Sequence, residues 1–134
     1  MKNKIILGLR LIAAAILIQT LYFKFSGAAE SKFIFETLGV EPYGRYFAGF
    51  SELIASILLL VPATQIIGAA MSIGIMIGAI ASHLLILGVV VQNDGGLLFT
   101  LACIVLTLSA VIIYLQREEI PKLIQTGKKL CRIN

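Results

Sequence analysis

Four long apolar stretches, separated by short polar segments, constrain this chain more than any other feature of its sequence. They cover about residues 5–23, 45–61, 65–91 and 97–115. A helix that crosses the hydrocarbon core of a bilayer needs about 20 apolar residues. Of the whole chain, 59% is hydrophobic and 13% charged, whereas a soluble domain carries about 25% charged residues. We therefore predict an all-α integral membrane protein with four spans.

The segments that connect the stretches predict how the helices are arranged. Pro62-Ala63-Thr64 and residues 92–96 are tight turns, so the helices that they join should be antiparallel neighbours. The first connection, residues 24–44, has an apolar group between Ser31, a helix start, and Gly39, a helix stop. It is too short to span, so we predict a short helix at the interface or folded back. The result is an antiparallel four-helix bundle, one domain over residues 1–134.

The distribution of Lys and Arg predicts the orientation of the helices. Lys2 and Lys4 precede the first stretch, and several bases follow the last one. The bases of the first connection are matched by three glutamates, and the third connection carries only Asp94. Cytoplasmic segments are enriched in Lys and Arg. We therefore expect a multi-pass protein of the cell membrane, the inner membrane where there are two, with both termini cytoplasmic.

The basic tail, residues 116–134, has two interpretations. Its apolar side chains alternate with bases, as in an amphipathic segment that lies on an anionic inner leaflet. The same composition also suits a solvated tail. The net charge of +4 lies largely beside the spans, so we expect lipid as the surroundings and no nucleic-acid partner.

Several function classes lack the residues that they need. Cys103 and Cys131 are far apart and have no CxxC spacing, so neither a disulfide framework, a thiol redox motif nor a metal site is predicted. Phosphate-binding and metalloprotease motifs are missing from the sequence. No metal is therefore expected, and no cofactor is evident.

Small residues predict where the helices approach each other, because lipid supplies no hydrophobic drive for helix association. One stripe in the third stretch recurs every four residues and includes a GxxxG pair: Ala70, Gly74, Gly78 and Ser82. The second stretch has a similar face: Ala48, Gly49, Ala55 and Ser56. We predict that the two faces meet inside the bundle. The alternative for the stripe of the third stretch is a face that forms a dimer.

Ionisable residues within the stretches carry the functional signal, because each costs at least about 2.5 kcal/mol to insert and usually faces the interior with a partner. Glu52 lies in the second stretch and His83 in the third. With a rise of about 1.5 Å per residue, both lie at a similar depth in the outer half. Lys24, Arg45 and Gln19 belong to the same half. We predict a buried polar cluster of these five residues beneath the first connection.

Two interpretations of this cluster remain open. In one, Glu52 pairs with a basic neighbour and only locks helices together. In the other, Glu52 and His83 face a ligand or exchange protons. The sequence leaves open which base pairs with Glu52. Arg10, near the cytoplasmic end of the first stretch, is expected to extend its charge toward the headgroups.

The order and spacing of short motifs resemble the DoxX family over about residues 5 to 115. The motifs are Lys24-Phe25-Ser26-Gly27, Leu38-Gly39, Glu41-Pro42-Tyr43-Gly44-Arg45, Gly49, Glu52-Leu53, Gly78-Ala79-Ile80 and His83-Leu84. The resemblance implies a four-span membrane protein, a shared glutamate at Glu52 and a frequent histidine at His83. The family's name-giving members are subunits of a thiosulfate:quinone oxidoreductase, and relatives are tied to redox-stress complexes and membrane-protein assembly. Quinone as a cofactor is implied by the resemblance alone.

Three functions follow as hypotheses. The first is an accessory subunit of a quinone-linked redox or stress-response complex, which needs partner subunits. The second is a protein that binds or transports a small molecule, proton or quinone in a cavity at Glu52 and His83, open toward the outer side. A stand-alone enzyme ranks last, because no nucleophile, base and orienting group converge by spacing. The first connection, with Lys32, Glu36, Glu41 and Tyr43, is a candidate lid.

Overall fold

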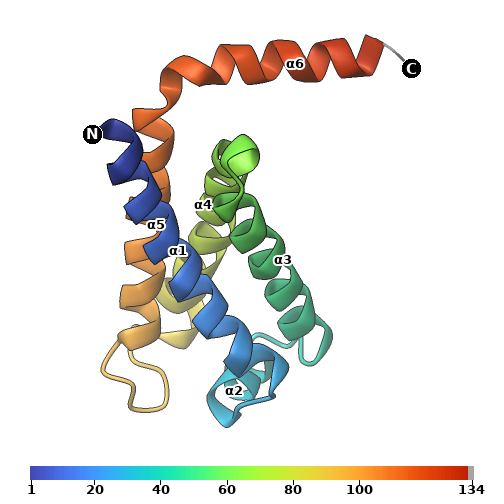
Figure 1. The fold of residues 1–134 in the computed structure, drawn as a ribbon. Helices are drawn as coiled ribbons and strands as arrows, with labels where there is room; N and C mark the ends of the chain where they lie inside the picture. Colours follow the sequence, from blue (N-terminus) through green and yellow to red (C-terminus); the bar gives the residue numbers. More distant parts are fainter. Residues whose placement is uncertain (133–134) are drawn as a thin grey trace.

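Helices make up all the regular secondary structure in residues 1–132, the part of the chain that the computed structural model describes. The α-helices are α1 (Lys2–Phe25), α2 (Ala29–Thr37), α3 (Tyr43–Leu60), α4 (Gln65–Ser82), α5 (Leu97–Leu115) and α6 (Ile120–Arg132) (Figure 1). Short 3₁₀ turns cover Pro62–Thr64 and Arg117–Glu119, and a π-helical turn covers His83–Leu87. The predicted all-α class is confirmed. The last two residues of the predicted tail lie outside the described residues.

Three helical segments of residues 1–132 are long and apolar enough to cross a membrane: Lys2–Phe25, Pro62–Leu87 and Leu97–Leu115. A membrane protein is therefore the conclusion that length and composition support. Helix α3 is not among the three. It has 18 residues and includes Arg45 and Glu52, and these two charges lower its mean hydropathy.

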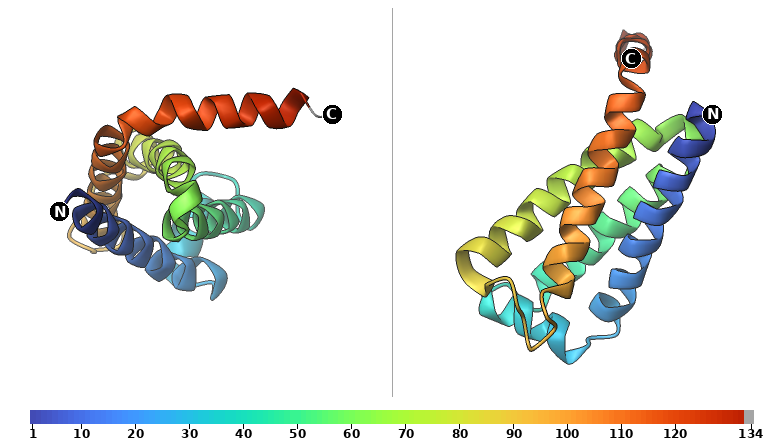
Figure 2. Two further views of the ribbon diagram at one scale, coloured as in Figure 1. Left: turned by 45° about the horizontal axis from the view of Figure 1, so that its top comes forward. Right: turned by 90° about the vertical axis from the view of Figure 1, so that its left-hand side faces the viewer.

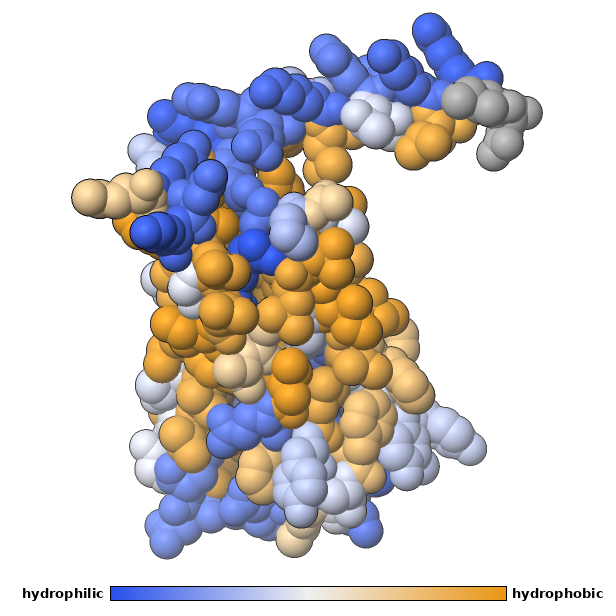
Figure 3. Space-filling view, in the orientation of Figure 1, coloured by the Kyte–Doolittle hydropathy of each residue, from blue (hydrophilic) through white to orange (hydrophobic). Residues whose placement is uncertain are grey.

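The long helices α1, α3, α4 and α5 surround a common interior. Helix α1 packs against α3 and α5, and α4 packs against the same two helices. The N-terminus and α6 lie at one end, whereas α2 and the loop before α5 lie at the other (Figures 1 and 2). On the face shown in Figure 3, the surface between the ends is largely an apolar band, with hydrophilic side chains above and below it. The core side chains include Leu17, Ala55, Leu59, Ala69, Val105 and Ile112.

The small residues do not pack as the sequence predicted. A Cβ built on Gly74 or Gly78 would meet no atom within 4 Å, so the stripe with Ala70 and Ser82 is not a contact surface between helices. The inward side of α4 carries Gly68 instead, where a Cβ would lie 2.5 Å from the backbone nitrogen of Leu59 in α3. The prediction was wrong because it assumed a different rotation of α4 about its axis.

Gly49 is buried, as expected, but its neighbour is not the small face of α4. A Cβ on Gly49 would lie 3.0 Å from the aromatic ring of Phe25, which comes from α1. Gly49 therefore makes room for a large side chain. The predicted meeting of the two small faces is a further part of the packing prediction that was wrong.

Arg10 is buried and does not extend toward the headgroups, contrary to the prediction. Its Nε donates to the carbonyl oxygen of Leu59 at 2.5 Å, and its Nη2 donates to that of Leu60 at 2.5 Å. The last carbonyls of a helix have no partner within the helix. Arg10 of α1 therefore caps the C-terminal end of α3.

Two predicted helix boundaries shift. Helix α2 begins at Ala29, and Ser31 is a buried residue of its first turn. The third stretch leaves helical structure after Leu87, where Gly88 has a φ of +80°. The fourth stretch has the predicted bounds, and Gly39, with a φ of +74°, follows α2 as the predicted stop.

Candidate functional site

A cavity of about 470 Å³ lies among helices α1 to α5. Its wall is mostly apolar, with Leu17, Met76, Ala102 and Val105 among the lining residues. The polar lining residues belong to the segments nearest α2: the last turns of α1, the first half of α3, the end of α4, α2 itself and the loop before α5. They are Gln19, Thr20, Lys24, Glu30, Ser31, Ser51, Glu52, Ser82, His83 and Asp94. The cavity is thus apolar toward the middle of the helices and polar at one end.

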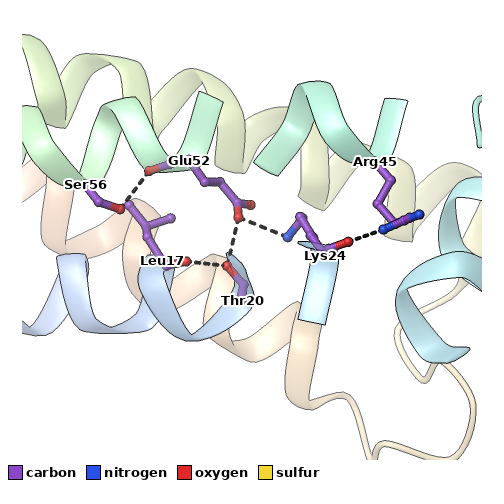
Figure 4. A network of polar contacts seen from close by, with 6 residues as sticks. All are labelled: Leu17, Thr20, Lys24, Arg45, Glu52 and Ser56. Carbon is purple, nitrogen blue, oxygen red and sulfur yellow. Dashed lines mark hydrogen bonds and ion pairs between the residues drawn. The ribbon is translucent and has the colours of Figure 1, made fainter. Parts of the chain in front are cut away.

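Glu52 holds the centre of this polar end. Its Oε2 accepts hydrogen bonds from the Nζ of Lys24 at 3.0 Å and from the Oγ1 of Thr20 at 2.8 Å (Figure 4). The side chain of Glu52 is 6% exposed and that of Lys24 is 16% exposed. The base that pairs with Glu52, which the sequence left open, is therefore Lys24. Both donors come from α1, so the carboxylate joins α3 to α1.

Arg45 takes part in the cluster only indirectly. Its Nε donates to the Glu41 carboxylate at 2.8 and 3.1 Å, and its guanidinium lies 4.5 Å from the ring centroid of Tyr46. A further nitrogen, Nη1, donates to the backbone carbonyl of Lys24 (Figure 4). Arg45 therefore holds the end of α1 beside α3. It does not line the cavity, whereas Lys24 and Glu52 do.

His83 reaches the cavity from the π-helical turn that follows α4. It is 5% exposed, and its ring meets that of Phe99 edge to face at 5.7 Å. Its Nδ1 lies 2.9 Å from the carbonyl oxygen of Gly88. Because a carbonyl only accepts, Nδ1 carries a proton in this contact, and Nε2 has no hydrogen-bond partner among residues 1–132. Single π turns in helices occur frequently at functional sites.

Gln19 is an exposed residue of α1 that also borders the cavity. The structure thus places four of the five predicted cluster residues on one cavity, with Arg45 behind them. Helix α2 lies where the lid was expected, and its Ser31, Ile34 and Phe35 line the cavity. Of the residues that the sequence suggested for that role, Lys32, Glu36 and Tyr43 are exposed and Glu41 pairs with Arg45, and none of the four lines the cavity.

Asp94 was missed as a site residue and organises the loop at this end of the cavity. Its carboxylate accepts backbone N–H groups of Val91 at 3.1 Å, Gly96 at 2.8 Å and Leu98 at 3.3 Å. Burial acts to raise the pKa of Asp94, but these hydrogen bonds and the nearby His83 together bring it below its ordinary value. The carboxylate therefore stays ionised and keeps the loop folded against the cavity.

Thr20 was also missed, although the sequence contains a signal for it. Thr20 and Lys24 are four residues apart on α1, and such residues lie on the same face of a helix. A hydroxyl one turn from a buried base therefore reaches the same carboxylate.

Within residues 1–132, no group of three or more His, Cys, Asp or Glu side chains is placed to hold a metal ion. Cys103 and Cys131 are both free thiols. Comparison with known families, with curated proteins and with solved structures finds no match to this chain. The function is therefore argued from the cavity.

Proposed function

We propose that the protein crosses the cell membrane four times, with both termini in the cytoplasm, and binds a small, mostly apolar molecule in its cavity. The fourth span in this proposal is α3, which lies between α1 and α4 and turns most of its large apolar side chains outward, among them Phe47, Phe50, Ile54 and Ile57. Its two charges, Arg45 and Glu52, are buried and paired. An even number of spans agrees with an N-terminus and α6 at the same end (Figure 1).

The observation that carries the binding proposal is the cavity itself. Its volume of about 470 Å³ lies within the range of about 300 to 1,000 Å³ that is usual for small-molecule sites. Such sites are mainly apolar with a few placed polar groups. Here the polar groups are a carboxylate, an ammonium and an imidazole, at one end of an apolar chamber. The matching ligand has an apolar body and a compact polar head.

A quinone is the ligand class that we propose. Its carbonyl oxygens accept hydrogen bonds, which the Lys24 ammonium is able to donate, because it has three N–H groups and Glu52 takes only one of them. The hydroxyls of the reduced form donate, and the Glu52 carboxylate and the free Nε2 of His83 accept. The resemblance to the DoxX family directs the choice toward quinones. It remains a proposal, supported by the position of Glu52 and His83 on one cavity.

An accessory role in a redox or stress-response complex is the second proposal. It is favoured by the pairing of Glu52 with Lys24 at 3.0 Å, because an ion pair of this kind also serves to hold two helices in register. In that case the polar cluster is structural, and activity depends on a partner subunit rather than on the cavity.

Filling the cavity separates the two proposals. A leucine at Gly78 enters the cavity, because Gly78 lines it and has no atom within 4 Å of a built Cβ. Gly8 of α1 is equally free of neighbours but does not line the cavity, so Gly8→Leu is a matched control. The assay is retention of decylubiquinone by the purified protein in mild detergent.

We expect Gly78→Leu to weaken decylubiquinone binding by at least about tenfold, which corresponds to about 1.4 kcal/mol, while Gly8→Leu binds like the wild type. Equal binding by all three proteins, or no saturable binding by any of them, contradicts the quinone site. If Gly78→Leu loses binding while its melting temperature equals that of the wild type, the loss of binding arises in the cavity and not from unfolding.

A further inference from the structure

Helix α6 is the one α-helix among residues 1–132 in which no residue is buried, so no other helix in this part of the chain covers its surface. One side carries the apolar residues Ile120, Leu123, Ile124, Leu130 and Cys131, whose spacings of three, four and seven residues place them together on a helix. The other side carries Lys122, Lys128, Lys129 and Arg132. The helix contains no acidic residue. Helix α6 is therefore a strongly amphipathic cationic helix.

The position of α6 relative to the apolar band is the second observation. A three-residue turn, Arg117–Glu119, joins it directly to α5, one of the candidate spans. The helix lies across the ends of the long helices and not along them (Figures 1 and 2). In the space-filling view its hydrophobic atoms are on the side that faces the apolar band, and its hydrophilic atoms are on the side away from it (Figure 3).

The end of α5 has the side chains of a membrane interface. Tyr114 is 63% exposed, and the guanidinium of Arg117 lies 4.6 Å from its ring centroid. Tyrosines at the headgroup level are typical anchors of membrane helices. In the proposed four-span topology, α6 thus begins where α5 leaves the hydrocarbon, and its axis runs along the plane of the headgroups.

We propose that α6 is a binding surface for anionic phospholipid headgroups, with its apolar side among the first carbons of the acyl chains. Its four bases lie at the level where phosphate and serine or glycerol headgroups carry negative charge. A cationic amphipathic helix binds such a surface through burial of its apolar side and through electrostatic attraction of its bases to the headgroups. A solvated helix would leave the apolar side in water. The inference rests on the span formed by α5 and is independent of the cavity ligand, so either proposal can fail alone.

Cys131 provides a native probe of depth, because it lies on the apolar side of α6 and is exposed. A Cys103→Ser variant leaves it as the single thiol for a nitrobenzoxadiazole label. The matched variant carries the label on the opposite side, through Gln125→Cys with both native cysteines replaced by serine. Both labelled proteins are placed in nanodiscs of phosphatidylcholine, with and without phosphatidylglycerol, that contain nitroxide-labelled lipid.

We expect the Cys131 label to be quenched by the lipid nitroxide and blue-shifted in the anionic nanodiscs, and the label at position 125 to stay in water. Removing phosphatidylglycerol, or the double change Lys128→Gln and Lys129→Gln, should reduce the quenching at Cys131. Equal quenching at the two positions overturns the proposal. So does an aqueous Cys131 label in both membranes, which would point to a solvated helix or to a protein partner for this side.

Discussion

The Glu52 carboxylate illustrates how a single residue shapes this protein. A carboxylate among apolar helices is stable only when donors surround it, and two donors of α1 reach the same oxygen, Lys24 at 3.0 Å and Thr20 at 2.8 Å. The remaining oxygen, Oε1, accepts no protein hydrogen bond within residues 1–132, and Glu52 lines the cavity. The residue therefore holds α3 to α1 through one oxygen and has a second oxygen without a protein partner among these residues.

Replacing this carboxylate should weaken the fold without preventing membrane insertion. In Glu52→Gln the amide oxygen still accepts from Thr20, but the Lys24 ammonium loses its counter-charge in a largely dry site. We expect a loss of about 2 kcal/mol in the free energy of unfolding, measured by titration with sodium dodecyl sulfate in mixed micelles. Glu36→Gln on the exposed side of α2 is the control and should change little. A wild-type unfolding curve for Glu52→Gln would remove Glu52 from the centre of this account.

The Asp94 loop should respond to pH in a defined direction. The folded-state pKa of Asp94 lies below its ordinary value, so ionised Asp94 stabilises the fold above about pH 4, and this stabilisation is lost as the pH falls through the lowered pKa. The wild type should therefore melt at a higher temperature than Asp94→Asn at pH 7, and the difference should shrink in acid. A difference that stays constant down to pH 3, followed by circular dichroism, would show that the carboxylate charge is not what holds the loop.

Much of the polar cluster could be predicted from the sequence residue by residue, because the free-energy cost of placing charges in lipid forces Lys24, Glu52 and His83 to face the interior. The partner of Glu52 could not, since the choice between Lys24 and Arg45 depends on the rotation of α1 against α3. Arg45 is drawn away by Glu41, one turn earlier in the sequence and 2.8 Å away.

Among the helices, α3 and α4 approach each other closely at Gly68. Leu58 and Leu59 lie directly against this glycine, and their backbone atoms would be 2.5 to 2.8 Å from an added Cβ. Close backbone approach through glycine is a common means of helix association in membranes. The turn Pro62–Thr64 is only three residues long and therefore keeps the two helices together at this end.

Adding one methyl group at this approach should be costly. Gly68→Ala forces α3 and α4 apart, and we expect a loss of about 2 kcal/mol in the free energy of unfolding, as for overpacked cores. Gly8→Ala, where nothing lies within 4 Å, should be neutral or slightly stabilising because alanine favours helix. Similar unfolding curves for the two variants would mean that the backbones do not approach closely at Gly68.

The sequence predicted the elements better than their contacts. Helix α5 has the predicted ends, since apolar length alone sets a span, and α2 appears as the short helix of the first connection. The Gly74 and Gly78 stripe was assigned to packing because small residues suit contact surfaces. Small residues suit a cavity wall equally well, and the sequence contains no signal that separates the two.

For the whole molecule, the proposed topology rests on the order of the helices and on the distribution of charge. We expect the N-terminus and α6 on the cytoplasmic side and α2 on the other, because bases without matching acids gather at the former end. Labelling with a membrane-impermeant maleimide shows which side of the membrane a cysteine faces. The single cysteines are introduced by Lys2→Cys, Glu36→Cys and Gln125→Cys in a protein without the native cysteines. In intact cells that express the protein, only the cysteine at position 36 should react. Reaction at position 2 but not at 125, or the reverse, would contradict an even number of spans.

The cavity exists only when the helices are packed together. From the sequence alone, only its polar lining residues could be predicted. Its volume depends on how far α1, α3, α4 and α5 stand apart, which is set by contacts such as Gly68 against Leu59 and Gly49 against Phe25. None of these contacts is visible in the spacing of apolar residues.

The most direct test of the account is fluorescence quenching at a tryptophan placed in the cavity wall. The chain contains no tryptophan, so Phe35→Trp, in a lining position of α2, provides a single reporter, and quinones quench indole emission on contact. The account predicts saturable quenching by decylubiquinone that is lost when Gly78→Leu is added and kept when Gly8→Leu is added. Quenching that rises linearly with quinone concentration and is the same in all three proteins would show that the quinone only dissolves in the surrounding lipid.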